Sequence, residues 1–335
     1  MNKNTTSTQT MSKPLVVGFF REKRDIEEFV FKAEQYKQAY HELIDQLNEK
    51  GVYVAVLMGQ GSYLGDGKFS KHWVQVNNGG TYRFEKRGPI TVDTVLVKDF
   101  FDVPDTPEML QINTQALRVI SRDKHKTYEL LSEFHPKSFI VDSTSEVDHV
   151  MEDMPGSHIA IKALEGNSGK AVYVGPKDEF DTAKFDFPLP WQVQEYIETG
   201  AGIPGITEGR HDLRVVIING QAIIATLRTP PDGGYKSNIG YGGVTSLIGI
   251  EDIPAELRGL CAKIDEILAP YGKERLYSAD FGLTEHGWRL FEINAMPGTI
   301  NRARGPEAVY YQDKLTDFLK TAAKVGRAQK ERNAS

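Results

Sequence analysis

The pattern of apolar and polar positions is clearest near the start of the chain. Residues 15–20 form a continuous apolar run, which predicts a buried strand. Between residues 25 and 50, apolar side chains recur at steps of three and four, which predicts an amphipathic helix that ends at Gly51. Residues 52–58 form a second apolar run. The sequence therefore predicts a β-α-β unit, the start of a parallel sheet.

Later segments alternate between short strands and helices. Residues 71–97 contain short apolar runs separated by turn residues, which predicts a hairpin added to the first sheet. Strand patterns at 139–141, 159–162 and 171–174 surround a predicted helix near 145–151. Hairpins then dominate as far as Ile253, and helical periodicity returns at 256–269 and 306–325. This mixture predicts an α/β (α+β) protein.

Composition and charge narrow the class of protein. The chain has 335 residues, with 40 Lys and Arg against 46 Asp and Glu, and the net charge of −6 argues against a general nucleic-acid binder. Cys261 is the single cysteine, which excludes an intramolecular disulfide and a cysteine-based zinc site. No apolar run approaches the roughly 20 residues needed to span a bilayer. We therefore expect a globular, cytoplasmic protein without nucleic-acid or membrane partners.

A glycine-rich turn follows a predicted strand that ends in a lysine. Lys162 precedes the segment GNSGK at 166–170, and a second strand follows directly. Glycine permits positive φ and close backbone approach, and exposed N–H groups can bind phosphate oxygens. The segment lacks the GK[ST] and the following helix of a P-loop, and it lacks the helix of a dinucleotide fingerprint. By itself, an ordinary hairpin turn explains it equally well.

Two strand-like segments near the C-terminus carry acidic and amide side chains. They span residues 278–283 and 289–294, and a turn centred on His286 would place Asp280 directly opposite Glu292. Asn294 shares the face of Glu292. Like charges at this range repel unless a cation lies between them, and oxygen donors without Cys or His favour Mg²⁺. The sequence thus predicts a magnesium site, and the alternative is an exposed hairpin with scattered acids.

A third predicted hairpin carries two arginines. Asn219 and Gly220 predict a type I′ turn, and Asp212 shares a face with Arg214. Arg214 and Arg228 are candidates for neutralising a phosphate or a developing oxyanion. With a plain two-residue turn they fall on opposite faces, so both reach one site only if a bulge intervenes or the strand ends before Arg228. For either arginine, a surface salt bridge is the alternative.

In this order, the segments resemble the ATP-grasp superfamily, in particular glutathione-synthetase-like and ribosomal-S6-glutamate-ligase-like carboxylate–amine ligases. The resemblance covers roughly residues 110–300, from Asn113 through Asp123-Lys124 to the sequence EINAMPG at 292–298. It implies an ATP-grasp fold with a nucleotide cleft between two α+β subdomains. The expected division is a disordered arm at 1–13, a β-α-β pre-ATP-grasp domain at 14–115, a small subdomain with the glycine loop at 116–196, a large subdomain with the metal site at 197–326, and a solvated tail at 327–335.

The resemblance also implies roles for individual residues. Asp280, Glu292 and Asn294 would hold two Mg²⁺ ions, with Mn²⁺ as an alternative. Arg214, Arg228 and Asn238 would face the γ-phosphate of ATP and the acyl intermediate. Residues 194–197 would form the hinge strand whose backbone binds adenine. The full nucleotide-binding set would be Lys124, Lys162, Gly166, Asn167, Ser168, Gly169, Gln194, Glu195, Tyr196, Ile197 and Glu198.

The implied reaction is the activation of a carboxylate by ATP. An acylphosphate and ADP would form first, and an amine would then attack to give an amide and phosphate. The expected partners are a small-molecule carboxylate and an amine, such as an amino acid or small peptide, and a homo-oligomer is left open. Two alternatives remain: an ATP-grasp kinase that phosphorylates a hydroxyl group, and a non-catalytic nucleotide-binding module. The cleft lysines and metal carboxylates disfavour the module.

Residues 299–306 depart from the pattern of the named relatives, so the substrate is not carried over. Arg302 and Arg304 come shortly after the turn at Pro297 and Gly298, and we expect their side chains to enter the cleft. A guanidinium pairs a carboxylate in a bidentate fork. We hypothesise that at least one of these arginines binds a substrate carboxylate away from the reacting centre. The alternative is two solvated arginines before Pro306.

Overall fold

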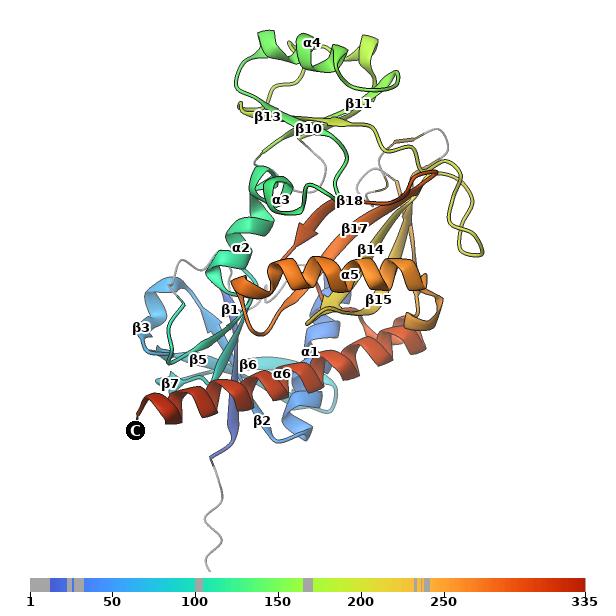
Figure 1. The fold of residues 1–335 in the computed structure, drawn as a ribbon. Coiled ribbons are helices and arrows are strands. Elements are labelled where there is room, and N and C mark those ends of the chain that lie inside the picture. The colour runs from blue at the N-terminus through green and yellow to red at the C-terminus, as the bar shows by residue number, and fades with distance from the viewer. Residues whose placement is uncertain are drawn as a thin grey trace, which may run out of the picture.

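The structure is a computed structural model that describes residues 13–22, 26, 33–99, 105–164, 171–231, 234–235, 237 and 242–334. Within these ranges the chain forms three larger β-sheets, one smaller sheet and helices packed on them (Figure 1). The predicted N-terminal arm lies outside the described residues except for Lys13. No helix of the described chain combines the length and the apolar character needed to cross a membrane.

The first sheet contains the predicted β-α-β unit. Its strand order is β6-β5-β2-β1-β8-β9, and β1 pairs in parallel with β2 and β8. Helix α1 (Glu34–Glu49) connects β1 to β2, while β5 and β6 form the predicted antiparallel hairpin. The strands are β1 (Leu15–Arg21), β2 (Val52–Met58), β5 (His72–Asn78), β6 (Thr81–Arg87), β8 (Thr94–Val97) and β9 (Leu110–Ile112), and the small sheet consists of β3 (Tyr63–Gly65), β4 (Lys68–Phe69) and β7 (Ile90–Thr91).

The second sheet forms a separate upper lobe in Figure 1. Its strand order is β10-β13-β11-β12, with antiparallel pairing throughout, and helix α4 (Thr144–Glu152) covers one face. The lobe has its own apolar core, which includes Val147, Ile161 and Trp191. The strands are β10 (Ser138–Val141), β11 (His158–Ala163), β12 (Val172–Pro176) and β13 (Trp191–Glu195).

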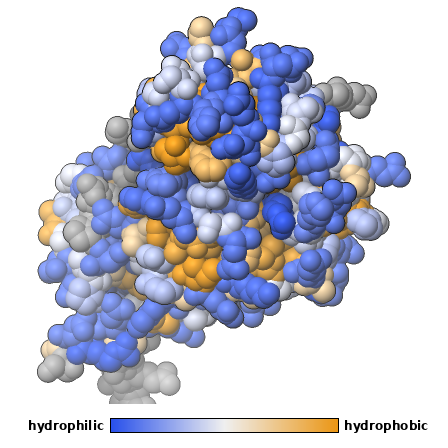
Figure 2. All heavy atoms as spheres, turned by 45° about the horizontal axis from the view of Figure 1, so that its top comes forward, coloured by the Kyte–Doolittle hydropathy of each residue, from blue (hydrophilic) through white to orange (hydrophobic). Residues whose placement is uncertain are grey.

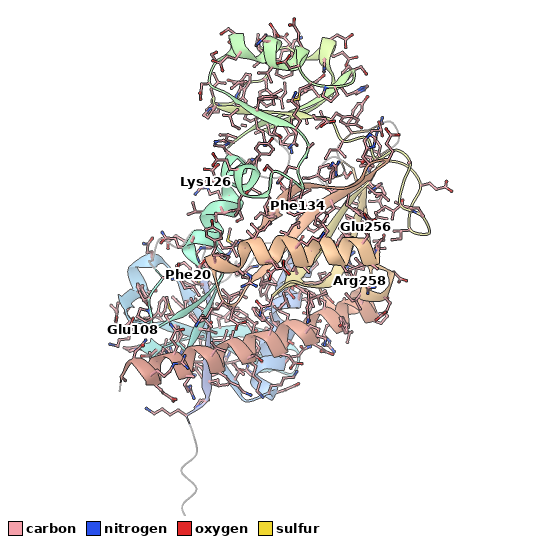
Figure 3. All side chains as sticks on the ribbon, viewed as in Figure 1. Phe20, Glu108, Lys126, Phe134, Glu256 and Arg258 are labelled. Atoms are coloured by element: carbon pink, nitrogen blue, oxygen red, sulfur yellow. The ribbon has the colours of Figure 1, made fainter. Side chains whose placement is uncertain are left out.

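The third sheet is an antiparallel sheet of order β16-β15-β14-β17-β18. Helix α5 (Ala255–Leu268) and the successive helices α2 (Gln115–Arg122) and α3 (Lys124–Leu131) share a core with it. Phe134, which follows α3, packs in this core, and its carbonyl accepts the N–H of Leu290 in β18 at 2.8 Å (Figure 3). The strands are β14 (Asp212–Ile218), β15 (Gln221–Thr229), β16 (Val244–Ile248), β17 (Leu276–Thr284) and β18 (Gly287–Asn294).

The C-terminal helix α6 (Pro306–Asn333) is longer than predicted and packs on the first sheet. Its apolar side chains share a core with Val17 and Phe19 of β1, although the sequence assigned this segment to the large subdomain. The predicted solvated tail is wrong for residues 327–333, which continue the helix. The apolar periodicity ends near 325, but Arg327 donates to Asp93 Oδ2 at 2.6 Å and Lys330 also contacts that buried carboxylate. Charged contacts with Asp93 thus hold the last turns of α6 against the first sheet, beyond the point where the apolar positions of the helix end.

We predict that Asn113→Ala destabilises the fold strongly. The buried Asn113 amide donates to the carbonyls of Leu276 and Ala295, both at 2.6 Å, and accepts the Leu276 N–H at 2.8 Å. Alanine would leave these buried backbone groups unpaired, so the free energy of unfolding should fall by about 3 kcal/mol. Urea denaturation measures the change, with the exposed Asn48→Ala as control. Equal stability of the two variants would contradict the prediction.

Candidate active site

A cleft of ≈ 1680 Å³ lies between the upper lobe, the third sheet and the end of the first sheet. Side chains from β11, β13, β14, β15, β17 and β18 line it, together with residues at the ends of β1 and β8. In the view of Figure 2, hydrophobic side chains gather below the upper lobe on a face that is otherwise largely hydrophilic. A cleft bounded by several elements and lined by charged groups is the natural candidate for an active site.

Strands β17 and β18 bring the two predicted metal carboxylates together. Asp280 pairs directly with Glu292, as the sequence predicted. The turn is shorter than expected, because Thr284 already pairs with Gly287. A β-bulge next to Asp280 then shifts the register by one residue, and without it Asp280 would face Phe291. The bulge therefore decides that both carboxylates point to the same side.

A second bulge aligns the two arginines. Asn219 and Gly220 have φ values of 46° and 81°, which fits the predicted type I′ turn. The register of β14 and β15 shifts between Val216 and Ile217, so that Asp212 pairs with Arg228. The condition derived from the sequence, a bulge between the arginines, is met. Arg214 and Arg228 consequently lie on one face with Asp212.

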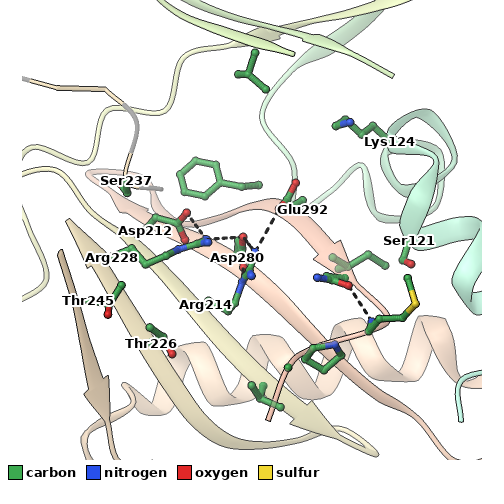
Figure 4. Close-up of a pocket in the computed structure, with 18 of the residues that line it drawn as sticks. Ser121, Lys124, Asp212, Arg214, Thr226, Arg228, Ser237, Thr245, Asp280 and Glu292 are labelled. Atoms are coloured by element: carbon green, nitrogen blue, oxygen red, sulfur yellow. Dashed lines mark hydrogen bonds and ion pairs between the residues drawn. The ribbon is translucent and has the colours of Figure 1, made fainter. Parts of the chain in front are cut away.

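These residues form one network of charged hydrogen bonds, drawn in Figure 4. Arg214 donates to both oxygens of Asp280, from Nε at 2.7 Å and from a terminal nitrogen at 2.6 Å. Arg228 donates to Asp280 Oδ2 at 2.6 Å and also to Asp212. Arg214 further lies 3.4 Å from Glu292 Oε1. Asp280 is thus bound by two guanidiniums, one of which also contacts the opposite carboxylate.

The three carboxyl groups of the network have pKa values that are shifted in different directions. Asp280 is 3% exposed, and although burial would raise its pKa, the Arg214 and Arg228 guanidiniums hold that pKa well below its usual range. Burial raises the pKa of Asp212 to about 6, against the opposing effect of Arg228. Partial desolvation in the cleft and the charge of Asp280 raise the pKa of Glu292. Negative charge at Glu292 would therefore be stabilised by a further cation.

The donor set fits a hard divalent cation. Among the described residues no group of three or more His, Cys, Asp and Glu side chains forms a metal site, so the candidate consists of two carboxylates and one amide. The side chain of Glu292 is 50% exposed, and its ion pair with Arg214, at 3.4 Å, leaves room for further ligation. Asn294 Oδ1 accepts the Met296 N–H at 2.9 Å and keeps a second lone pair. All donors are oxygens, which suits Mg²⁺.

Two lysines line the opposite side of the cleft. Lys162 on β11 donates to Gln194 Oε1 at 2.7 Å, and Gln194 in turn donates to Ser138 Oγ at 2.9 Å. Burial lowers the pKa of Lys162 to about 8, against the opposing charge of Glu292. Lys124 at the start of α3 donates to the carbonyls of Ala163 and Leu164, both at 3.1 Å. Both ammonium groups therefore lie where β11 ends.

Several predicted residues lie outside the described chain. These are the glycine-loop residues Gly166, Asn167, Ser168 and Gly169, together with Asn238. The strands on either side of the loop, β11 and β12, pair antiparallel, which confirms the predicted hairpin. The roles expected for these residues stay predictions.

The predicted hinge strand lies along the cleft, with one exception. Gln194, Glu195, Tyr196 and Ile197 line it, and Glu198 does not. Glu198 instead accepts the Gly200 N–H at 2.7 Å.

An aromatic cluster beside this strand was not predicted. His158 Nε2 lies 2.9 Å from the Tyr235 hydroxyl, the ring centroids of His158 and Tyr196 are 5.3 Å apart, and Arg210 lies 4.6 Å from the Tyr235 ring. Tyr196, Arg210 and Tyr235 line the cleft. No spacing in the sequence connects these residues, because three different segments supply them.

The structure separates the two C-terminal arginines. Arg302 donates to Asp313 Oδ1 at 2.7 Å and does not line the cleft, which corrects the expectation for this residue. Asp313 lies about two turns into α6 and draws Arg302 toward that helix. Arg304 is exposed and lines the cleft, as expected. The hypothesis of a substrate-binding arginine therefore now rests on Arg304.

Residues 124–302 match the family of the ATP-grasp domain of prokaryotic glutathione synthetases, and this segment is more than half of the 335 residues. The chain belongs to this ATP-grasp family. In this ATP-grasp protein, the two cleft lysines, the network around Asp280 and Asn294 all lie within the matched segment.

Individual relatives agree with this assignment. A "probable alpha-L-glutamate ligase" of Nitrosococcus oceani is 25% identical over 62% of this chain and 66% of its own length, so the chain spans slightly less than two thirds of that relative. VanG D-Ala:D-Ser ligase from Enterococcus faecalis superposes with a TM-score of 0.61 at 13% identity, over 93% of this chain and 100% of that one. The ATP-grasp ligase PsnB, solved with Mg and ADP, gives 0.58 at 12% identity over 92% and 98%. These two structures show the ATP-grasp fold of the chain.

We predict opposite effects on stability at the two facing carboxylates. Asp280→Asn would leave Arg214 and Arg228 without their shared counter-ion, and the free energy of unfolding should fall by about 3 kcal/mol. Glu292→Gln removes a partly exposed charge next to Asp280 and should not lower the melting temperature. Thermal and urea unfolding of both variants measure the difference. A similar loss in both would contradict the assigned network.

Proposed function

We propose that the protein is an ATP-dependent ligase that joins a carboxylate to an amine. The observation that carries this proposal is the register that sets Asp280 opposite Glu292 with two arginines on the same face, while two lysines line the other side of the cleft. The names of the relatives support it, since they are glutamate, D-Ala:D-Ser and ATP-grasp ligases. In this reaction the acid becomes an acylphosphate, ADP leaves, and the amine displaces phosphate.

Each side of the cleft would bind a different part of the reactants. Lys124 and Lys162 would pair with phosphate oxygens of ATP, and the segment 194–197 would bind its base. Arg214 and Arg228 would offset the charge that gathers when a carboxylate approaches a triphosphate. Two Mg²⁺ ions, or Mn²⁺, held by Asp280, Glu292 and Asn294 would neutralise phosphate charge. The described chain contributes cations and positioning, and no protein nucleophile is required.

The substrates would be a small-molecule acid and an amine of the amino-acid or small-peptide class. The glutamate-ligase name of the relatives and the precursor bound to PsnB support this class. The test is ATP turnover with a panel of amino acids and dipeptides in the presence of hydroxylamine, which converts an acylphosphate into a hydroxamate. Hydroxamate together with ADP is the expected result. ADP without hydroxamate would instead indicate transfer to a hydroxyl group, and the ligase proposal would be withdrawn.

We predict that Lys162→Met weakens nucleotide binding. ATP with Mg²⁺ should raise the melting temperature of the unaltered protein by mass action, and the rise should be much smaller in this variant. The matched control is Lys137→Met, because Lys137 also donates to an oxygen acceptor, the carbonyl of Asp153, but does not line the cleft. Equal melting shifts in the two variants would show that Lys162 does not contact the phosphates.

A further inference from the structure

A series of hydrogen bonds crosses three neighbouring strands of the second sheet and reaches Lys162, one of the two cleft lysines. In the order β10-β13-β11, Ser138 pairs directly with Gln194. Gln194 in turn pairs with Ala160, which lies two residues before Lys162 on β11. Side chains alternate between the two faces of a sheet, so Ser138, Gln194 and Lys162 share one face. Val193 points to the other face, into the apolar core of the upper lobe.

The direction of each hydrogen bond in this series is fixed. The Lys162 ammonium carries only donors, so it bonds to the oxygen of the Gln194 amide, Oε1, at 2.7 Å. The amide nitrogen donates to Ser138 Oγ at 2.9 Å, and the Ser138 hydroxyl donates to the Pro136 carbonyl at 3.0 Å. A carbonyl cannot donate, so the series cannot reverse. The Gln194 amide is therefore held with its oxygen toward Lys162.

The two residues that support Lys162 are buried, which makes their mutual bond important. Gln194 is 2% exposed and Ser138 is 6% exposed. A buried amide that loses its partner pays the full desolvation of an unpaired polar group. If Ser138 Oγ were removed, the amide of Gln194 would also lose the contact that selects its orientation. Ser138 thus acts on Lys162 through Gln194.

Gln194 holds the ammonium without neutralising its charge. Lys162 forms no ion pair with a carboxylate of the described residues, and the carboxylates of Glu292, Asp212 and Asp280 act on it only at longer range. An ammonium has three N–H bonds, and Gln194 accepts one of them. A carboxylate in place of the amide would compete with an anionic ligand for this charge. The neutral amide leaves the charge to the ligand.

We propose that Gln194 and Ser138 are positioning residues that orient the Lys162 ammonium toward a phosphate group of the nucleotide. The proposal rests on the proposed function in that it takes the ligand to be ATP. A lysine side chain loses rotamer freedom when it binds, and a side chain that is already held in place loses less. This role belongs to the side chain of Gln194 and is separate from the contact with adenine expected of its backbone.

The test compares the binding of ATP and adenosine by isothermal titration, with Mg²⁺ present and without any acid or amine. Adenosine contains the base and the ribose but no phosphate. Gln194→Met keeps the length of the side chain and removes the acceptor, so ATP should bind about tenfold more weakly while the affinity for adenosine is unchanged. An unchanged affinity for ATP, or an equal loss for both ligands, would overturn the proposal.

A double-mutant cycle shows whether the effect passes through Lys162. Lys162→Met alone should weaken ATP binding. Adding Gln194→Met to this variant should cause no further loss, because the ammonium that Gln194 orients is then missing. Losses that simply add would mean that Gln194 acts on the nucleotide by another route, and the positioning role would be rejected.

Ser138 provides a second, independent set of variants. Ser138→Ala should weaken ATP binding about threefold, and Ser138→Thr, which keeps the hydroxyl, should restore it. The matched control is Ser62→Ala, because the buried Ser62 hydroxyl also donates to a backbone carbonyl, that of Gly59 at 2.7 Å, but does not line the cleft. If Gln194→Met does not fold, Ser138→Ala decides, and an affinity for ATP equal to that of the control would refute the proposal.

Failure of the positioning role and failure of the ligase function give different results. ATP binding requires no turnover and reports on the series of hydrogen bonds alone, whereas hydroxamate formation reports on the ligase reaction. A protein whose affinity for ATP depends on Gln194 through Lys162, but which forms no hydroxamate, would keep the positioning role and lose the ligase assignment. A protein that forms hydroxamate but binds ATP equally well without the Gln194 acceptor would do the opposite.

Discussion

The bidentate contact between Arg214 and Asp280 is the interaction on which the arrangement of the cleft depends. It joins the middle strand β14 to β17, and through Glu292 it also reaches β18. A buried carboxylate is stable in such a place only because two guanidiniums compensate its charge. Since these arginines come from different strands, the strands must keep their register for the network to form. Stability and the proposed function therefore depend on the same side chains.

Side-chain parity explains how much of this site could be predicted from sequence. Alternation along a strand placed Glu292 with Asn294 and Asp212 with Arg214, and an assumed turn placed Asp280 opposite Glu292. The predicted pairing of Asp280 with Glu292 is correct, but the predicted turn is not. The observed turn is shorter, and a bulge next to Asp280 compensates for the difference. Parity cannot locate a bulge, because one extra residue is set by local backbone geometry and packing. For the arginines, the sequence could state only the condition that the bulge between Val216 and Ile217 fulfils.

Contacts between distant segments were beyond the reach of sequence patterns. The apolar stripe of α6 predicted a helix but not the sheet against which it packs, and the charged residues that dock its last turns resemble a solvated tail. The same limit applies to the cluster of His158, Tyr196 and Tyr235, whose members have no common spacing. Arg302 and Arg304 were equivalent in sequence, and the position of Asp313 about two turns into α6 distinguishes them. Periodicity specifies elements, whereas partners at long range decide which side chains reach the cleft.

Charge is distributed unevenly along the cleft: the cations around Asp280 are paired with carboxylates, whereas the Lys98 ammonium contacts a carbonyl and a ring. Around Asp280, each guanidinium already has a carboxylate partner, so an incoming phosphate competes with Asp280 for Arg214 and Arg228. Under the proposed function, that competition would leave Asp280 in need of a different cation and would so link nucleotide binding to divalent metal binding. At the end of the first sheet, the Lys98 ammonium donates to the Pro297 carbonyl and has no carboxylate partner among the residues that the structure describes. An anion bound there would displace no carboxylate of the described residues and would leave the Asp280 network unchanged. If the protein has the proposed ligase function, nucleotide binding at this network would thus depend on the metal ion, whereas binding at the end of the first sheet would not disturb it.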